Sequence, residues 1–224
     1  MAPVITLVIE ASTYAGSVAL FRDGALVATR DVAMRGRERE ALMPAVAELI
    51  EEQQVAPGAL GRIVCGSGPG SFTSLRVAGS IAKGLALAAD CPLVPVSSLA
   101  LLVASREPAV PGRYLAAIDA LRGEHYVELF ELEAVGGLRS LSPERRVSSA
   151  EVESIAEAAG AVTIGPDRHG VAHAVPRAAG AVRLSSQLAS ATPADLRRWE
   201  PAYGRLAEAQ VKWESAHGRP LEAV

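Results

Sequence analysis

Hydrophobic and polar residues follow two different periods along the first half of the chain, and the change of period separates strands from helices. Runs of β-branched and other apolar residues predict strands at residues 3–9, 16–21, 25–32, 62–66 and 93–96. Apolar residues three or four positions apart predict helices at 40–52, 75–89 and 99–105. The Asp23-Gly24 pair between the second and third runs is typical of a hairpin turn. The predicted order is βββαβαβα.

A similar order begins again after Pro108 and Pro111-Gly112 interrupt the chain. The predicted elements of the second half are strands at 114–119, 125–132, 138–147 and 161–165 and a helix at 149–159. Ser148 and Glu151 have the spacing of a capping box at the start of that helix. Residues 195–216, after Pro193, are helical in pattern. We therefore divide the chain into an N-terminal lobe (1–107), a C-terminal lobe (108–200) and a C-terminal helical tail (201–224).

Two lobes that each have a βββαβα core describe the two-lobed α/β architecture of actin, Hsp70 and hexokinase, which is a ribonuclease H-like fold. In that architecture a nucleotide usually lies in the cleft between the lobes. With 224 residues, half of them apolar, the chain is long enough to bury such a core, and its composition excludes a disordered protein.

Charge and cysteine content limit which binding partners and which cellular compartment we expect for the protein. The 22 Lys and Arg residues are outnumbered by 25 Asp and Glu, and no basic tract is present, so we expect the chain to reach nucleic acid only through a partner. Cys65 and Cys91 are too few for a disulfide framework or a cysteine-based zinc site. Residues 1–12 lack the basic residue of a signal peptide, and no long uncharged apolar stretch follows, so we expect a cytoplasmic protein without membrane contact.

The segment Gly66-Ser67-Gly68-Pro69-Gly70-Ser71 leads from a predicted strand into a predicted helix and has two interpretations. Free N–H groups at the N-terminus of a helix can hold a phosphate. Pro69 has no N–H, however, and the segment lacks both a Walker lysine and the third glycine of the dinucleotide fingerprint. A structural turn that uses the conformational freedom of glycine is the alternative.

Glu10 and Asp119 end the first strand of each predicted lobe, where the acids of a two-lobed phosphotransferase hold a magnesium–phosphate complex. Ser12, Gly68 and Gly70 would complete such a cleft. Acids at strand ends are also commonplace solvated residues, and Glu10 is longer than the Asp that such sites ordinarily use. We interpret these five residues as a vestigial nucleotide cleft, and we predict no catalytic residue, bound metal or cofactor in this chain.

His169 and His173 are four residues apart, a spacing at which two imidazoles on one helix can bind zinc. Gly170 between them and Pro166 upstream argue against a helix, and no Glu separates the pair, so two exposed loop residues are the alternative. The Gly-x-Ser-x-Gly elbow of a serine hydrolase does not occur in the sequence.

The helices at 40–52 and 75–89 carry more apolar surface than one core contact needs. On the second helix we expect Leu75, Ile81 and Leu85 to face one side and an adjoining face to be free. The predicted partner surface consists of Met43, Val46, Ala47 and Ile50 on the first helix and Arg76, Ser80, Lys83, Gly84 and Leu87 on the second. Gly84 allows close approach of another helix, which could belong to a second subunit or to the same chain.

Four motifs in order resemble the TsaB (YeaZ) family of tRNA threonylcarbamoyladenosine biosynthesis. The glycine-rich segment with Phe72-Thr73-Ser74-Leu75-Arg76 is similar to the family's GxGPGSFTGLR, with Ser74 in place of a glycine. Pro95 to Ala100, Asp119-Ala120 with Gly123-Glu124 and Tyr126, and Pro201-x-Tyr203-x-Arg205 resemble V-S-S-L-A, D-A-R-x-G-E-x-Y and P-x-Y-x-R. The chain departs from the family at Glu10, Glu38 and Leu121, where the pattern has Asp, His and Arg.

The resemblance implies a non-catalytic paralogue of TsaD, the enzyme that transfers a threonylcarbamoyl group to the adenosine beside the tRNA anticodon. It implies that the chain binds and activates TsaD as a heterodimer, that the ATPase TsaE joins the complex, and that partners handle ATP, metal and tRNA. The implied contact is made by the helices at 40–52 and 75–89. We also expect a second copy of the chain to occupy this face as a homodimer when TsaD is absent. The competing functions are a small-metabolite kinase of the same fold and a glycoprotein peptidase.

Overall fold

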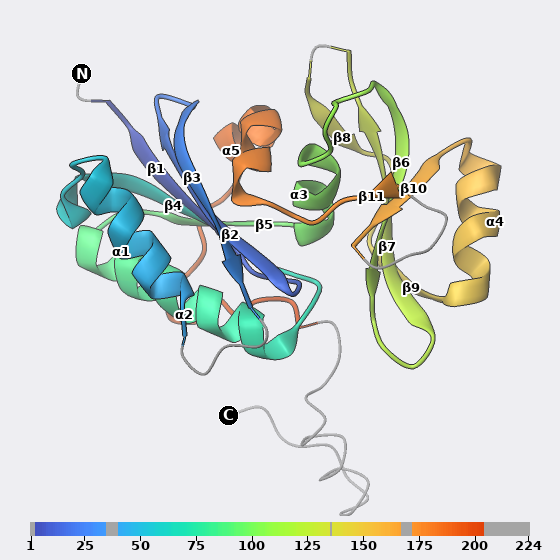
Figure 1. The fold of residues 1–224 in the computed structure, drawn as a ribbon, viewed down its shortest axis with the longest axis horizontal. Coiled ribbons are helices and arrows are strands. Elements are labelled where there is room, and N and C mark those ends of the chain that lie inside the picture. Colours follow the sequence, from blue (N-terminus) through green and yellow to red (C-terminus); the bar gives the residue numbers. More distant parts are fainter. Residues whose placement is uncertain (1–2, 35–39, 135, 167–171, 204–224) are drawn as a thin grey trace, which may run out of the picture.

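The computed structural model describes residues 3–34, 40–134, 136–166 and 172–203, which form two α/β lobes side by side (Figure 1). The strands of the N-terminal lobe are β1 (Ile5–Glu10), β2 (Ala15–Arg22), β3 (Ala25–Ala33), β4 (Leu60–Gly66) and β5 (Leu93–Val96). They form one sheet in the order β3-β2-β1-β4-β5. The hairpins β1-β2-β3 are antiparallel, whereas β1, β4 and β5 run parallel because helices connect them.

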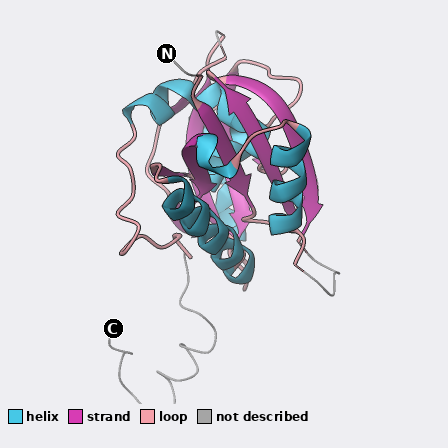
Figure 2. Ribbon diagram, turned by 90° about the vertical axis from the view of Figure 1, so that its left-hand side faces the viewer, coloured by secondary structure: helices cyan, strands magenta, loops and turns pink. Residues whose placement is uncertain are grey.

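Helices cover both faces of this sheet. On the outer face lie α1 (Leu42–Glu52) and α2 (Phe72–Ala89), with the short 3-10 helix η1 (Pro57–Ala59) between them in sequence (Figures 1 and 2). On the inner face lies α3 (Ser98–Ala104), every residue of which is buried. Its N-cap, Ser97, accepts the backbone N–H of Ala100 at 3.3 Å.

The C-terminal lobe is built on a second sheet, in the order β11-β10-β6-β7-β8, with β9 also paired to β7. Its elements are β6 (Gly112–Asp119), β7 (Glu124–Leu132), β8 (Leu138–Ser140), β9 (Arg145–Ser148), α4 (Ser149–Ala159), β10 (Val162–Gly165) and β11 (Ala172–His173). Val152 and Ala156 of α4 pack on one face of the sheet, and the other face packs on α3. The predicted capping box is confirmed, since the side chains of Ser148 and Glu151 each bond the backbone of the other residue.

After β11 the chain returns to the space between the two sheets as η2 (Ala178–Leu184) and α5 (Ser185–Ser190). Both belong to one apolar core that includes Val8 of β1, Leu102 of α3 and Phe130 of β7. Ser17 of β2 accepts the backbone N–H of Ala178 at 2.7 Å, which fixes η2 to the N-terminal lobe. The interior between the lobes is therefore packed with α3, η2 and α5.

The predicted two-lobed fold is confirmed, with four differences in detail. The strand expected at 138–147 divides into β8 and β9, because Ser142 interrupts it and its hydroxyl accepts the N–H of Leu129. The second lobe ends in η2 and α5 rather than in a helix packed on its own sheet. Residues 191–203 contain a turn and no helix, and the rest of the predicted tail lies outside the described residues.

The fourth difference is the face that α2 turns to the core. The small residues Ala78, Ala82 and Ala86 are buried with Leu75, whereas Ile81 and Leu85, predicted beside Leu75, are only partly buried at the edge of the core. Small side chains at this contact let the helix axis lie close to the sheet. Among the helices of the described residues, none is long and apolar enough to cross a membrane.

Candidate functional site

Glu10 at the end of β1 does not face a cleft. Its side chain is fully buried, Oε1 accepts the N–H of Ser12 at 2.5 Å, and Oε2 accepts the hydroxyl of Ser98 at 2.9 Å. Burial raises the pKa of this carboxyl, while the bonds from Ser12 and Ser98 act in the opposite direction. The prediction that Glu10 faces a metal–nucleotide cleft is therefore wrong, because the longer side chain turns into the lobe and ties β1 to α3.

Gly66 makes room for this acid. A Cβ on Gly66 would lie 1.8 Å from Oε2 of Glu10 and 3.1 Å from the hydroxyl of Ser98, so any larger residue would collide with the buried carboxyl. Ser12, also predicted in the cleft, is 1% exposed, and its hydroxyl has no hydrogen-bond partner among the described residues. The two residues lie in the interior of the lobe.

The glycine-rich segment uses its N–H groups internally. Ser67 donates to the carbonyl of Val96 at 2.8 Å, and Gly68 donates to the Ser98 hydroxyl at 3.1 Å. At the start of α2, Ser71 donates to the carbonyl of Ser12 at 2.7 Å. These bonds occupy the N–H groups of Ser67, Gly68 and Ser71, and to that extent they favour the structural turn over the phosphate site.

Close approach explains the glycines of the segment. A Cβ on Gly70 would lie 2.1 Å from the carbonyl oxygen of Ser12, and a Cβ on Gly68 would lie 2.4 Å from the carbonyl oxygen of Ala202. Gly68 also has a φ of 94°, in the region that favours glycine. Both predicted cleft glycines are therefore required for packing of the backbone.

Residues 194–203, which we call the C-terminal strap, lie along α2 and end at the glycine-rich segment. The backbone of Ala202 donates to Ser67 at 2.6 Å, and the ring of Tyr203 packs on Phe72 with 4.7 Å between centroids. Pro201 covers Gly79, where a Cβ would lie 3.0 Å from the proline Cγ. The family motifs P-x-Y-x-R and GxGPGSFT thus contact each other, a relation that the sequence alone does not reveal.

Two candidate residues of the C-terminal lobe, Asp119 and His173, are exposed. Asp119 is exposed, and its Oδ1 accepts the N–H of Leu121 at 2.7 Å in the turn between β6 and β7. His173 is exposed on β11, not on a helix, and His169 lies outside the described residues. Within the described parts of the chain, no group of three or more His, Cys, Asp and Glu side chains could hold a metal ion. Glu10 is thus buried in the N-terminal lobe, whereas Asp119 is exposed in the C-terminal lobe.

The predicted partner surface is partly exposed and partly internal. Val46 is fully buried and Ile50 is 7% exposed, so the prediction that they extend an outer face is wrong. Both belong to the core under α1 because the helix turns a wide stripe to the sheet. Lys83 is half-buried, and its Nζ donates to the carbonyl of Trp199 in the C-terminal strap at 2.9 Å.

The remaining residues of that surface are exposed on the two outer helices of the lobe. On α1, Met43 and Ala47 are exposed. On α2 the exposed residues are Arg76, Ser80, Gly84 and Leu87. Leu87 is 67% exposed, and a Cβ on Gly84 would meet no atom within 4 Å. We call these six residues the α1–α2 face. The C-terminal strap covers another side of α2, where it contacts Gly79 and Lys83.

Comparison with known proteins places the chain in a family. The TsaD family, tRNA N6-adenosine threonylcarbamoyltransferase, matches residues 34–164. TsaB of Bacillus subtilis (strain 168), a tRNA threonylcarbamoyladenosine biosynthesis protein, is 30% identical over 92% of this chain and 96% of that protein. TsaB of Escherichia coli (strain K12) is 37% identical over 54% of this chain and 52% of that protein.

Solved structures agree with the sequence relatives. A Pseudomonas aeruginosa protein described as similar to peptidase YEAZ superposes with a TM-score of 0.76 at 30% identity, over 92% of this chain and all of that one. YeaZ from Pseudomonas aeruginosa superposes with a TM-score of 0.72 at 26% identity, over 91% of this chain and all of that one. The chain thus belongs to the TsaB (YeaZ) family of tRNA threonylcarbamoyladenosine biosynthesis proteins.

Proposed function

We propose that this chain is the non-catalytic subunit that binds and activates TsaD in tRNA threonylcarbamoyladenosine biosynthesis, and that it does so through the α1–α2 face. In this proposal TsaE joins the same complex in the cytoplasm, the partners handle ATP and metal, and tRNA is bound only by the assembled complex. When TsaD is absent, a second copy of the chain takes its place on the same face.

The buried position of Glu10 supports a non-catalytic role. A phosphotransferase needs an acid and free N–H groups directed at a metal–nucleotide complex. Here Glu10 is buried against α3, and the N–H groups of Ser67, Gly68 and Ser71 bond to Val96, Ser98 and Ser12. The buried position of Glu10 therefore argues against the kinase alternative. We expect the isolated chain to show no saturable magnesium-dependent ATP binding, and micromolar binding abolished by Asp119→Ala would contradict this.

The observation that carries the proposed contact is the exposed α2 stripe with Leu87 at its end and Gly84 at its centre. A large apolar side chain that is two-thirds exposed, next to a helix position with no side chain, fits a second helix packed at short distance. Since the TsaD family matches residues 34–164 of this chain, which include both helices, TsaD is expected to present a related helix pair. Two such pairs can pack against each other.

The test is Gly84→Leu, measured by co-expression with the cognate TsaD and by binding of the purified proteins. The new side chain would occupy the space of the partner helix, which typically costs about 1–3 kcal/mol, or roughly 5–150-fold in affinity. The isolated variant should be as stable as the parent or more so, because leucine is a better helix former than glycine by about 0.5–1 kcal/mol and nothing lies within reach of the new Cβ. Loss of binding is thus separated from loss of folding.

Ala158→Leu is the matched control, because Ala158 is an exposed small residue on helix α4 of the other lobe. It adds the same apolar side chain away from the α1–α2 face and should leave TsaD binding unchanged. If Gly84→Leu co-purifies with TsaD and supports tRNA modification at parental concentrations, the contact lies elsewhere and the proposal fails.

A further inference from the structure

The second turn of α2 carries an arginine whose guanidinium is held by an aromatic ring. Arg76 is exposed, and its guanidinium carbon lies 5.4 Å from the centroid of the Phe72 ring, one turn earlier on the helix. This cation–π contact favours one orientation of the guanidinium. Arg76 forms no ion pair or side-chain hydrogen bond with any residue that the structure describes. Its N–H groups are therefore directed at solvent and can bind an acceptor of another molecule.

The C-terminal strap supports the Phe72 ring. The ring of Tyr203, at the end of the strap, packs on Phe72 with 4.7 Å between centroids and 53° between ring planes. Burial raises the pKa of the Tyr203 hydroxyl, Glu200 acts in the same direction, and the charge of Arg76 acts in the opposite direction. Arg76 is thus close to Tyr203 as well. We call Arg76, Phe72 and Tyr203 the aromatic support.

The strap is itself fixed along α2 just before Tyr203. The N–H of Ala202 donates to the carbonyl of Ser67 at 2.6 Å. Lys83, the other basic residue of α2, donates to the carbonyl of Trp199 at 2.9 Å. These bonds anchor the backbone that carries the Tyr203 ring. They also engage the charge of Lys83, so Arg76 is the basic side chain of α2 that remains for a partner.

Arg76 belongs to the exposed side of α2 on which we place the partner. Arg76, Ser80, Gly84 and Leu87 follow one another at intervals of four, four and three residues, so they share one side of the helix. A helix packed on Gly84 would therefore remove part of the water around Arg76. A charge that loses water costs free energy unless an acceptor replaces that water. A partner for this face thus needs an acceptor opposite Arg76.

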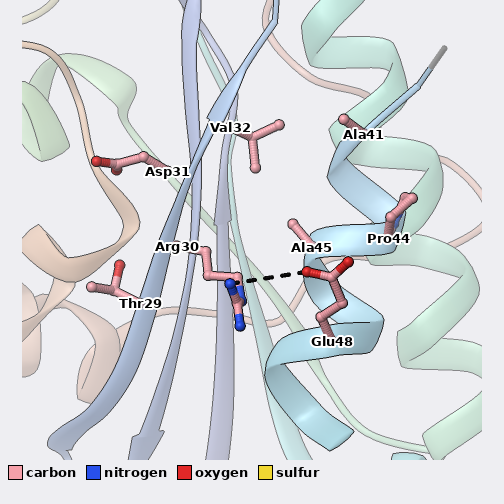
Figure 3. Close-up of a pocket in the computed structure, with 8 residues that line it drawn as sticks. All are labelled: Thr29, Arg30, Asp31, Val32, Ala41, Pro44, Ala45 and Glu48. Carbon is pink, nitrogen blue, oxygen red and sulfur yellow. Dashed lines mark ion pairs between the residues drawn. The ribbon is translucent and has the colours of Figure 1, made fainter. Parts of the chain in front are cut away.

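The surrounding charges favour a single carboxylate as this acceptor. On α1, Glu48 and Glu52 pair with Arg30 of β3 across the groove shown in Figure 3, and Glu51 is exposed without an ion pair to any described residue. A nucleic acid needs several cations along its phosphates, whereas α2 offers one and α1 is acidic. One carboxylate on a protein surface matches one oriented guanidinium.

We propose that Arg76 binds a carboxylate of TsaD, and that Tyr203 is a positioning residue that holds Arg76 in its binding orientation through the Phe72 ring. This inference rests on the proposed function, because it takes TsaD as the partner of the α1–α2 face. Arg76 touches the partner, whereas Tyr203 acts through Phe72. A guanidinium that is oriented before binding loses less side-chain entropy on binding, so the aromatic support increases affinity.

The test is a calorimetric titration of purified TsaD with the full chain. Arg76→Ala should weaken binding by about 10–150-fold, because a hydrogen bond between charged groups is lost. Raising the salt concentration should weaken the parent more than it weakens Arg76→Ala. Arg145→Ala is the matched control, because Arg145 is an exposed arginine on β9 of the other lobe. It should bind TsaD as the parent does.

Tyr203→Leu removes the ring but keeps an apolar side chain, and it should weaken binding by about 2–10-fold. Tyr203→Phe keeps the ring and should bind as the parent does. In the Arg76→Ala background, Tyr203→Leu should have no further effect, because Tyr203 acts only through Arg76. Thermal unfolding of each variant identifies any loss of folding, and the salt dependence of the parent tests the ion pair without a substitution.

The outcomes separate this inference from the proposed function. If Gly84→Leu weakens binding and Arg76→Ala does not, the α1–α2 face stands and the carboxylate contact is overturned. If neither variant weakens binding, the proposed function fails with it. Equal effects of Tyr203→Leu in both backgrounds would overturn its positioning role. If Arg76→Ala leaves TsaD binding at the parental value but weakens tRNA binding by the assembled complex, the acceptor is a phosphate and the proposal is overturned.

Discussion

Gly66→Ala tests whether the buried acid and the glycine beside it form one unit. The added methyl would lie 1.8 Å from Oε2 and 2.8 Å from Cδ of Glu10, so the carboxyl must move. Overpacking a buried site costs about 1–3 kcal/mol, and loss of the buried hydrogen bond from Ser98 to Glu10 costs about 1–3 kcal/mol more. We therefore expect the free energy of unfolding to fall by about 2–6 kcal/mol.

The assay is equilibrium unfolding in urea together with thermal unfolding. For a chain of this size each kcal/mol shifts the midpoint by about 2–4 °C, so the variant should unfold about 4–24 °C below the parent. Gly58→Ala is the matched control, because Gly58 is an exposed glycine with no atom within 4 Å of its Cβ position. It should change the free energy of unfolding by no more than about 0.5 kcal/mol.

A double-mutant cycle isolates the contact between the two residues. Glu10→Ala removes the carboxylate that the new methyl meets, so Gly66→Ala should cost about 1–3 kcal/mol less in that background than in the parent. The reasoning is refuted if Gly66→Ala unfolds at the parental midpoint. It is equally refuted if the two penalties add in the double variant.

Two further outcomes are expected from individual residues. Burial raises the pKa of Glu10 above 4.5, so the folded chain keeps this proton at pH values where the unfolded chain has lost it. The free energy of unfolding should therefore fall as the pH rises from 4.5 through the raised pKa. Urea unfolding at several pH values should show that Glu10→Gln removes this part of the pH dependence. Ser148→Ala removes the N-cap of α4 and should cost about 0.5–2 kcal/mol in thermal unfolding while TsaD binding stays parental.

The sequence predicted most elements of the fold because each carries a strong local signal. Alternating and helical periods placed β1 to β5 and α1 to α4 within a few residues, and the Ser148-x-x-Glu151 spacing marked the start of α4. The presence of η2 and α5 and their position between the lobes could not be predicted in this way. Their short apolar runs match no single period, and their position between the lobes depends on contacts with α3 and β2, which are distant in sequence.

The candidate site was harder to predict than the fold, because periodicity indicates which residues share a helix face but not how wide the buried stripe is. On α1 the stripe takes in Val46 and Ile50, so only Met43 and Ala47 remain of the predicted outer residues. On α2, Lys83 donates a hydrogen bond to the carbonyl of Trp199 in the C-terminal strap. The signal that could have revealed the strap is Gly79, a helical glycine whose missing side chain makes room for Pro201.

The internal position of Glu10 links the interior of the N-terminal lobe to the proposed partner surface. Glu10 holds the hydroxyl of Ser98, and the same hydroxyl accepts the N–H of Gly68 in the glycine-rich segment. That segment leads into α2 at Phe72, one turn before the exposed Arg76. Because these bonds join the buried acid to the segment that leads into α2, we expect Glu10 to help orient this helix. Substitutions at Glu10 are thus expected to act on partner binding through α2, without any contact between Glu10 and the partner.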